Sequence, residues 1–376
     1  MLLLLAVSSA AYAQDEEGDA NATTTSAIFL LEGGATPGQA ASISIGMRRG
    51  LRDVQGVRFV HPVDALSEVA MTDDLQMSID ELEPIADMVR TGDPSAAADQ
   101  IDQVVANFER NLVLVPRAQL VDAYMLAAVA RCRMGQRREC EARIRDIIAF
   151  REGLTYDTAR YPADVEEVFQ RVRARALSGG RGALVVETEP AGAEIYIDGQ
   201  SYGPSPITAE GLLEGSHYIT IKAIGYEKAI ERAQVRAGRT ERVSYTLSPN
   251  ERWQIVLAPE AQRVLRGELG EPQAGERVRT IGNRLGASQL IVGIVRPAAG
   301  GQVHVQVYLY HMLTRLLQAQ REATLTIDEA GMEAARQLTV DLYSGVDLSG
   351  TIQVIEEDSG IRRQPELYEQ WWFWTC

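Results

Sequence analysis

The clearest pattern along this chain is a strict alternation of apolar and polar residues between residues 182 and 248. Residues 193–197 and 218–223 show it best, because alternate side chains there fall on one face of an extended strand. Turn residues separate such stretches, and Asp198-Gly199 is a pair typical of tight hairpins. About six short, half-polar strands in so short a segment predict a small antiparallel β-sandwich.

Residues 74–178 show helical rather than alternating periodicity. Gly92 and Gly135 are each followed by a small residue five positions later and a large apolar residue nine positions later. The small residues are Ala97 and Cys140, and the apolar residues are Ile101 and Ile144. A glycine that breaks a helix, followed by a small residue where two helices approach, is expected of repeated helical hairpins. We therefore predict helical hairpin repeats here, with a plain helical bundle as the alternative.

The segments 27–70 and 253–348 each contain part of an α/β pattern. The first holds a strand, a helix over 39–53 and a second strand, which is too little to fold alone. The second holds two helices, three apolar strands and a final helix capped by Asp328. We predict that the two segments pair into one α/β domain, with the helical and sandwich units inserted between them. The predicted fold class is therefore multidomain α+β.

The N-terminus carries a targeting pattern. Residues 1–13 contain an apolar run and then a small-x-small triplet that ends at Ala13, so we predict signal-peptide cleavage between Ala13 and Gln14. No Lys or Arg precedes the apolar run, and a buried N-terminal strand is the alternative. Residues 14–26 are acidic and rich in threonine, which predicts a flexible leader.

Aromatic residues gather at the other end of the chain, after a polar linker predicted at 349–370. They are Trp371, Trp372, Phe373 and Trp374. Exposed aromatics after a linker are typical of a membrane interface, so we predict that 371–376 begins an anchor that this sequence does not include. The alternative is an edge strand that folds back onto the body of the protein.

Composition narrows the class of partner. Hydrophobic residues make up 45% of the chain and charged residues 24%, as in ordinary globular proteins. A net charge of −15 repels phosphates and therefore argues against nucleic acid as a partner. All basic residues except Lys222 and Lys228 are arginines, apart from the four histidines.

The cysteines and histidines give little sign of a metal or cofactor. Cys132, Cys140 and Cys376 are too few for a disulfide scaffold. Cys132 and Cys140 fall on successive predicted helices, so a disulfide could clamp that hairpin in an oxidising compartment; two small buried residues are the alternative. The histidines are scattered without the spacing of metal ligands, and we predict no metal and no cofactor.

Catalytic motifs are missing from the sequence pattern. No glycine-rich loop has the spacing that binds phosphate, and no serine has the context of a nucleophile elbow. Pairs of acidic residues fall in linkers or at helix starts, where solvated charge or the helix dipole explains them. We therefore predict that the protein is not an enzyme.

Residues 188–199, with the sequence TEPAGAEIYIDG, resemble the signature of the PEGA domain, with Ala191 in place of the central Glu. The signature positions are Pro190, Ala191, Gly192, Ala193, Asp198, Gly199, Gly225 and Tyr226. The resemblance implies an extracytoplasmic β-sandwich of bacterial surface and envelope proteins, without established catalytic activity. The helices of 74–178 resemble tetratricopeptide repeats. We interpret the aromatics of the sandwich as structural, with sugar stacking by Tyr196 or Tyr202 as the alternative.

These features together predict an exported protein of the periplasm or cell envelope, tethered to a membrane. Its expected role is to mediate contacts with protein partners or with a cell-wall or surface polymer. One alternative is a periplasmic accessory of an assembly or secretion apparatus. Another is the carbohydrate-binding part of a carbohydrate-active enzyme.

Overall fold

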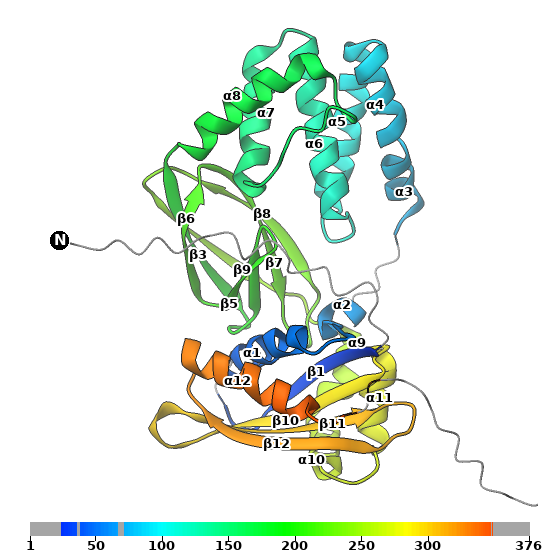
Figure 1. Ribbon diagram of the computed structural model, residues 1–376, viewed down its shortest axis with the longest axis vertical. Helices are drawn as coiled ribbons and strands as arrows, with labels where there is room; N and C mark the ends of the chain where they lie inside the picture. Colours follow the sequence, from blue (N-terminus) through cyan, green and yellow to red (C-terminus); the bar gives the residue numbers. More distant parts are fainter. Residues whose placement is uncertain (1–23, 36–37, 67–70, 347, 349–376) are drawn as a thin grey trace, which may run out of the picture. The chain divides into compact units, whose positions relative to one another are not determined.

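The computed structural model describes residues 24–35, 38–66, 71–346 and 348 (Figure 1). The predicted cleavage site at Ala13 and Gln14 lies outside the described residues, as does the linker predicted at 349–370. The aromatic residues Trp371, Trp372, Phe373 and Trp374 also lie outside them. None of the helices in the described ranges has both the length and the apolar character needed to cross a bilayer.

The α/β domain is built from the two ends of the chain. Its sheet has the strand order β12-β11-β10-β1-β2. The strands are β1 (Thr24–Glu32), β2 (Val57–Phe59), β10 (Gln289–Pro297), β11 (Val303–His311) and β12 (Leu317–Leu325). Strand β1 pairs in parallel with β10, from Ser26 opposite Gln289 to Glu32 opposite Val295. The predicted pairing of the terminal segments is therefore confirmed, although β1 begins inside the leader predicted at 14–26.

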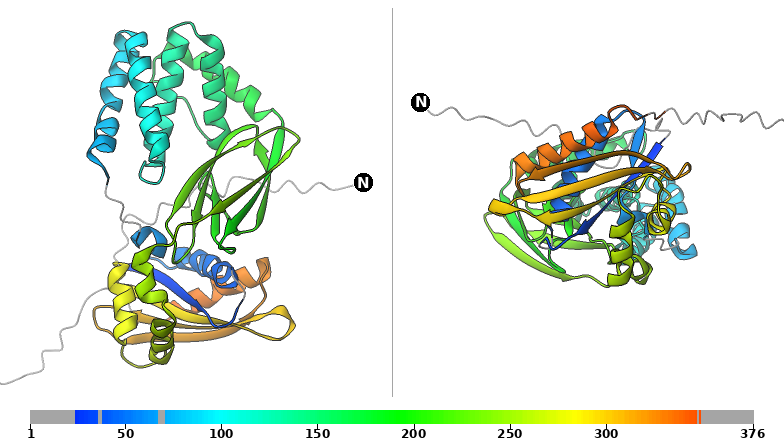
Figure 2. Two further views of the ribbon diagram at one scale, coloured as in Figure 1. Left: turned by 180° about the vertical axis from the view of Figure 1, so that it is seen from behind. Right: turned by 90° about the horizontal axis from the view of Figure 1, so that it is seen from below.

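Helices cover both faces of this sheet (Figures 1 and 2). One face carries α1 (Gln39–Asp53) and α12 (Glu329–Tyr343), which run side by side. The other face packs against α9 (Glu251–Leu257), α10 (Pro259–Glu268) and α11 (Glu276–Arg284), with Phe29 and Val292 of the sheet in the shared core. The short α2 (Pro62–Leu66) follows β2. As predicted, the Asp328 carboxylate caps α12 by accepting the Gly331 amide at 2.9 Å.

Helices α1 and α12 approach closely because glycines face the contact. A Cβ atom added to Gly46 would lie 2.4 Å from the Met332 carbonyl oxygen, and one added to Gly50 would lie 2.3 Å from that of Arg336. Both distances are shorter than real Cβ contacts, so this packing needs residues without a side chain at these two positions.

The helical region consists of successive helices that pack against their neighbours. They are α3 (Asp73–Asp80), α4 (Leu82–Thr91), α5 (Pro94–Arg110), α6 (Arg117–Arg133), α7 (Arg137–Phe150) and α8 (Glu166–Leu177). Gly92 ends α4 and Gly135 follows α6, so each glycine lies between two successive helices, although φ is −116° at Gly92 and 76° at Gly135. The equivalent residues Ala97, Ile101, Cys140 and Ile144 are all buried. Successive helices therefore pack as hairpins, as predicted, and the repeat character of the region stays a prediction.

The sandwich has two sheets, with the strand orders β6-β3-β9 and β5-β4-β7-β8. Its strands are β3 (Arg181–Glu189), β4 (Glu194–Ile197), β5 (Gln200–Pro204), β6 (Ile207–Leu213), β7 (Gly215–Lys222), β8 (Ala229–Val235) and β9 (Thr240–Thr246). Leu184, Ile195 and Ile219 contribute to its core. The predicted antiparallel pattern is wrong for one pair, because β3 and β9 run parallel. Alternation along a strand shows which face is buried, but it does not show the direction of the neighbouring strand.

Candidate functional site

The signature residues of the sandwich lie in its turns and hold its strands. Pro190 follows a cis peptide bond, and Ala193 is buried in the core. Ala191, in contrast, is exposed. Gly192, Asp198, Gly199 and Gly225 all have positive φ, and Tyr226 forms an isolated bridge with Pro249. The signature therefore describes how this sandwich folds, and its residues do not converge on one cavity.

Asp198 has a further role, because its partly buried carboxylate lies beside His217. His217 Nδ1 lies 2.6 Å from Asp198 Oδ2, and the Tyr218 amide donates to Asp198 Oδ1 at 2.9 Å. His217 Nε2 lies 2.8 Å from the Leu213 carbonyl oxygen, which can only accept a hydrogen bond. Burial opposes the charge of His217, but its contacts with Asp198 raise its pKa overall. This pair fixes the β4–β5 turn.

The same turn contacts the helical region. Arg117 of α6 donates hydrogen bonds to the carbonyl oxygens of Asp198 and, at 2.7 Å, Phe150. The Tyr218 hydroxyl donates to that of Tyr124 at 2.7 Å. The Phe150 and Tyr218 rings meet edge to face, with centroids 5.0 Å apart. Helices α6 and α7 therefore both contact the sandwich.

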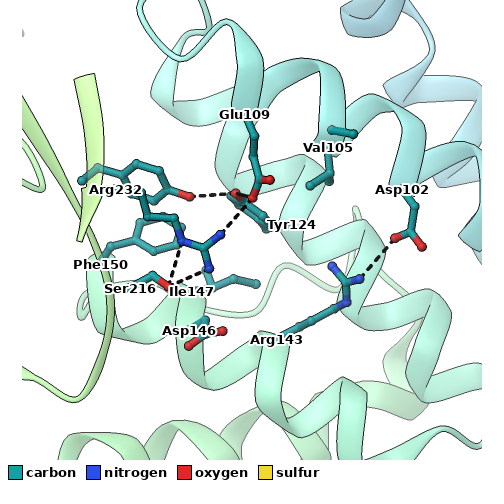
Figure 3. Close-up of a pocket in the computed structure, with 12 residues that line it drawn as sticks. Asp102, Val105, Glu109, Tyr124, Arg143, Asp146, Ile147, Phe150, Ser216 and Arg232 are labelled. Carbon is teal, nitrogen blue, oxygen red and sulfur yellow. Dashed lines mark hydrogen bonds and ion pairs between the residues drawn. The ribbon is translucent and has the colours of Figure 1, made fainter. Parts of the chain in front are cut away.

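A cavity of about 270 Å³ opens beside this contact (Figure 3). Helices α5, α6 and α7 line one side of it, and strands β7 and β8 line the other. Val105, Ile147 and Phe150 contribute the apolar part of the lining. All three side chains also belong to the buried core of the helical region. The cavity is therefore lined jointly by the helical region and the sandwich.

An arginine–carboxylate pair lies at each end of the cavity (Figure 3). Arg143 lies 3.3 Å from Asp102 at one end. Arg232 lies 3.1 Å from Glu109 at the other end and also donates to the Ser216 hydroxyl. These pairs hold fixed charges of both signs around the opening.

Asp146 projects between the two pairs and differs from the other acids of the cavity (Figure 3). Within the part of the chain that the structure describes, it has no hydrogen-bond or ion-pair partner. Burial raises the pKa of its carboxyl, and the more distant charges of Arg232, Arg145 and Arg143 oppose this rise without cancelling it. The cavity thus contains one unmatched carboxylate.

A second cluster of buried polar groups joins the sandwich to the α/β domain. Arg48 of α1 donates to Glu194 Oε2 at 2.6 Å and to the Tyr196 hydroxyl. His61 Nε2 lies 3.4 Å from the same Glu194 oxygen. Burial alone would raise the pKa of Glu194, but the Arg48 charge and these hydrogen bonds hold it at about 2. We call this group the Arg48–Glu194 cluster.

Both lysines of the chain continue this contact. Lys222 lies 2.6 Å and Lys228 lies 3.2 Å from the carboxylate of Asp64 in α2. The Lys222 ammonium also lies 5.0 Å from the centre of the Tyr196 ring. Tyr196 is therefore enclosed between cations, and Tyr202 packs against the sandwich core. Neither ring forms an open platform for a sugar.

Cys132 at the end of α6 and Cys140 in α7 are bonded through their sulfur atoms, with their Cα atoms 5.0 Å apart. The bond spans the turn at Gly135 and closes the α6–α7 hairpin. In the described ranges, no group of three acidic, His or Cys side chains is placed to hold a metal ion.

Sequence patterns had pointed to the sandwich and to the cysteines but not to the cavity or the Arg48–Glu194 cluster. In the sequence, the one hint of a charged contact at the sandwich was that both lysines of the chain fall within it.

Among curated proteins, no sequence matches this chain. Residues 181–251 match the family model of the PEGA domain, and the β-sandwich is therefore a module of a kind found in extracellular and surface-associated proteins.

Proposed function

We propose that the protein is an exported, non-catalytic binding protein that mediates protein–protein contacts in the periplasm or cell envelope. The PEGA match supports an extracytoplasmic location. The cavity supports the binding role, and it is the single observation that carries the proposal, because two modules must contribute to it. The aromatic residues 371–374 of the sequence support attachment to a membrane.

The lining of the cavity is suited to recognition. Its two arginine–carboxylate pairs are held by further hydrogen bonds, since Tyr124 donates to Glu109 at 2.7 Å and Ser216 accepts from Arg232. Charges that are fixed before a partner arrives need little reorganisation on binding. An apolar surface with a few oriented polar groups is the usual composition of a specific site.

A periplasmic accessory of an assembly or secretion apparatus is the second candidate. It is favoured by the Arg48–Glu194 cluster, which joins the PEGA sandwich to the α/β domain through buried charges. Such a joint would let one module hold a partner while the other docks on a larger assembly. Co-purification with a multi-subunit membrane complex would favour this candidate over a single binding partner.

The proposal is tested by filling the cavity and following co-purifying proteins from membranes and periplasm of the source organism. Ala106 lines the cavity on α5 and is exposed, so Ala106→Trp should block it without disturbing the core. Ala96 is exposed on the same helix but outside the cavity, and Ala96→Trp is the matched control. We expect the full chain and Ala96→Trp to retain the same partner, and Ala106→Trp to lose it.

Two outcomes would overturn the binding proposal. One is an identical set of partners for the three proteins. The other is specific retention of the full chain on purified peptidoglycan or a glycan array with no protein partner, which would favour the polymer-binding alternative.

A further inference from the structure

We infer that the cavity between α5–α7 and β7–β8 binds an arginine or lysine side chain presented by a protein partner. This inference rests on the proposed function and names the chemical group that the cavity would recognise.

The charges around the cavity leave one position for a cation. Among the described residues, its lining contains the carboxylates of Asp102, Glu109 and Asp146 and the guanidinium groups of Arg143 and Arg232, while Arg131, outside the lining, also pairs with Asp102. The two arginines are engaged with Asp102 and Glu109 at 3.3 and 3.1 Å. Asp146 is the acid of this lining that has no partner among the described residues, and a cation bound beside it would pair with its carboxylate. Desolvated charges are stable in proteins when they are paired in this way.

The surface next to Asp146 suits a long side chain with an apolar stem. Ile147, Val105 and Phe150 line the cavity and are buried in the helical core. Arginine and lysine place their methylene groups on such surfaces while the charged head reaches a polar partner. A cavity of about 270 Å³ lies near the lower limit for ligand sites and suits one side chain better than a large molecule.

Three arginines near Asp146 repel an incoming cation, but other groups reduce this repulsion. Arg143 and Arg232 already pair with carboxylates of the cavity, and Arg145 is exposed, so solvent screens its charge. The chain also carries a net charge of −15, which favours the approach of a basic partner.

The test uses three capped tripeptides that differ in one central residue. Glycine flanks arginine, lysine or the neutral arginine analogue citrulline, and each peptide is titrated into the full chain labelled at isoleucine methyl groups. We expect the arginine and lysine peptides to shift the Ile147 methyl resonance and the citrulline peptide to leave it unchanged. Asp146→Asn should weaken binding about tenfold, as the loss of one charged hydrogen bond predicts. Asp99→Asn, at an exposed position of α5, should bind as the parent chain does.

Three results would overturn this inference. They are equal binding of the citrulline and arginine peptides, equal binding by Asp146→Asn and the parent chain, and no shift of Ile147 with any peptide. If one of them occurs while Ala106→Trp still abolishes co-purification, the proposed function stands and the cation inference alone fails. If the arginine peptide depends on Asp146 while Ala106→Trp retains its partner, the proposed function fails instead.

Discussion

Single charged residues differ sharply in what surrounds them in this protein. Glu194 is buried with Arg48 and His61, whereas Asp146 is partly buried without any partner in the described structure. Burial disfavours charge in both cases, but only Glu194 has nearby groups that reverse the effect. The two acids should therefore respond in opposite ways to substitution and to pH.

Replacing Asp146 with Asn should stabilise the fold at neutral pH, by less than about 1 kcal/mol because the group is partly solvated. The folded pKa of Asp146 is raised above its usual 3.8, so the wild-type carboxyl costs stability only when ionised. The advantage of Asp146→Asn should therefore vanish below pH 3.8, grow between pH 3.8 and the raised folded pKa, and stay constant at higher pH. Urea unfolding of both proteins across this range measures the difference, and a variant that is less stable at pH 7 would contradict the argument.

Replacing Arg48 with Met should have a large opposite effect, because it leaves the Glu194 carboxylate buried without its main partner. A loss of about 3 kcal/mol in the free energy of unfolding is expected for such a broken pair. The neighbouring Arg49 pairs with Glu329 on the surface, so Arg49→Met is a matched control that should cost less than about 1 kcal/mol. Similar losses for the two variants in denaturant unfolding would show that the cluster adds no special stability.

Helices and strands show where sequence patterns succeed and where they stop. The helix predicted over 39–53 has those bounds in the structure, because an apolar stripe at helical spacing determines its buried face. That stripe does not reveal Gly46 and Gly50, which contribute to the contact with α12 by lacking side chains. Likewise, the cavity that contains Asp146 could not be predicted. It forms where helices contact strands, and the spacing of apolar residues within one helix or strand does not show which elements pack together.

The α1–α12 contact can be tested with one methyl group. Gly46→Ala should destabilise the protein by about 2 kcal/mol, because the new Cβ would meet the Met332 carbonyl oxygen and force the helices apart. Gly267 lies in α10 with open space around it, so Gly267→Ala should instead stabilise by about 0.5 kcal/mol or more. Thermal unfolding compares the two variants, and a neutral Gly46→Ala would mean that the helices have room to adjust.

The disulfide of the α6–α7 hairpin should contribute about 2 kcal/mol by restricting the unfolded chain. Reductant should lower the urea midpoint of the parent chain by a corresponding amount. A double variant with serine in place of Cys132 and Cys140 should be insensitive to reductant and is the control. Alkylation of the unfolded, non-reduced protein should modify Cys376 alone; modification of three thiols would exclude the bond.

At the scale of the whole molecule, a PEGA sandwich and a set of helical hairpins are inserted into an α/β domain. Apolar runs at both ends of the chain were sufficient to predict this split, because the first terminal segment has too few elements to fold alone. Sequence patterns could not predict the polar joints between the modules. These joints use isolated residues such as Arg48, Arg117 and Lys222, which resemble ordinary surface charges in the sequence.

The parallel pairing of β1 with β10 has a consequence for synthesis of the chain. Strand β1 is strongly apolar, yet its partner begins at Gln289, so one edge of β1 stays open until most of the chain has been made. An open apolar edge readily pairs with other chains. We therefore expect the nascent chain to need protection against aggregation during that interval. Pairing of β10 with β1 covers this edge, so we expect the need for protection to end once β10 has been synthesised and has paired.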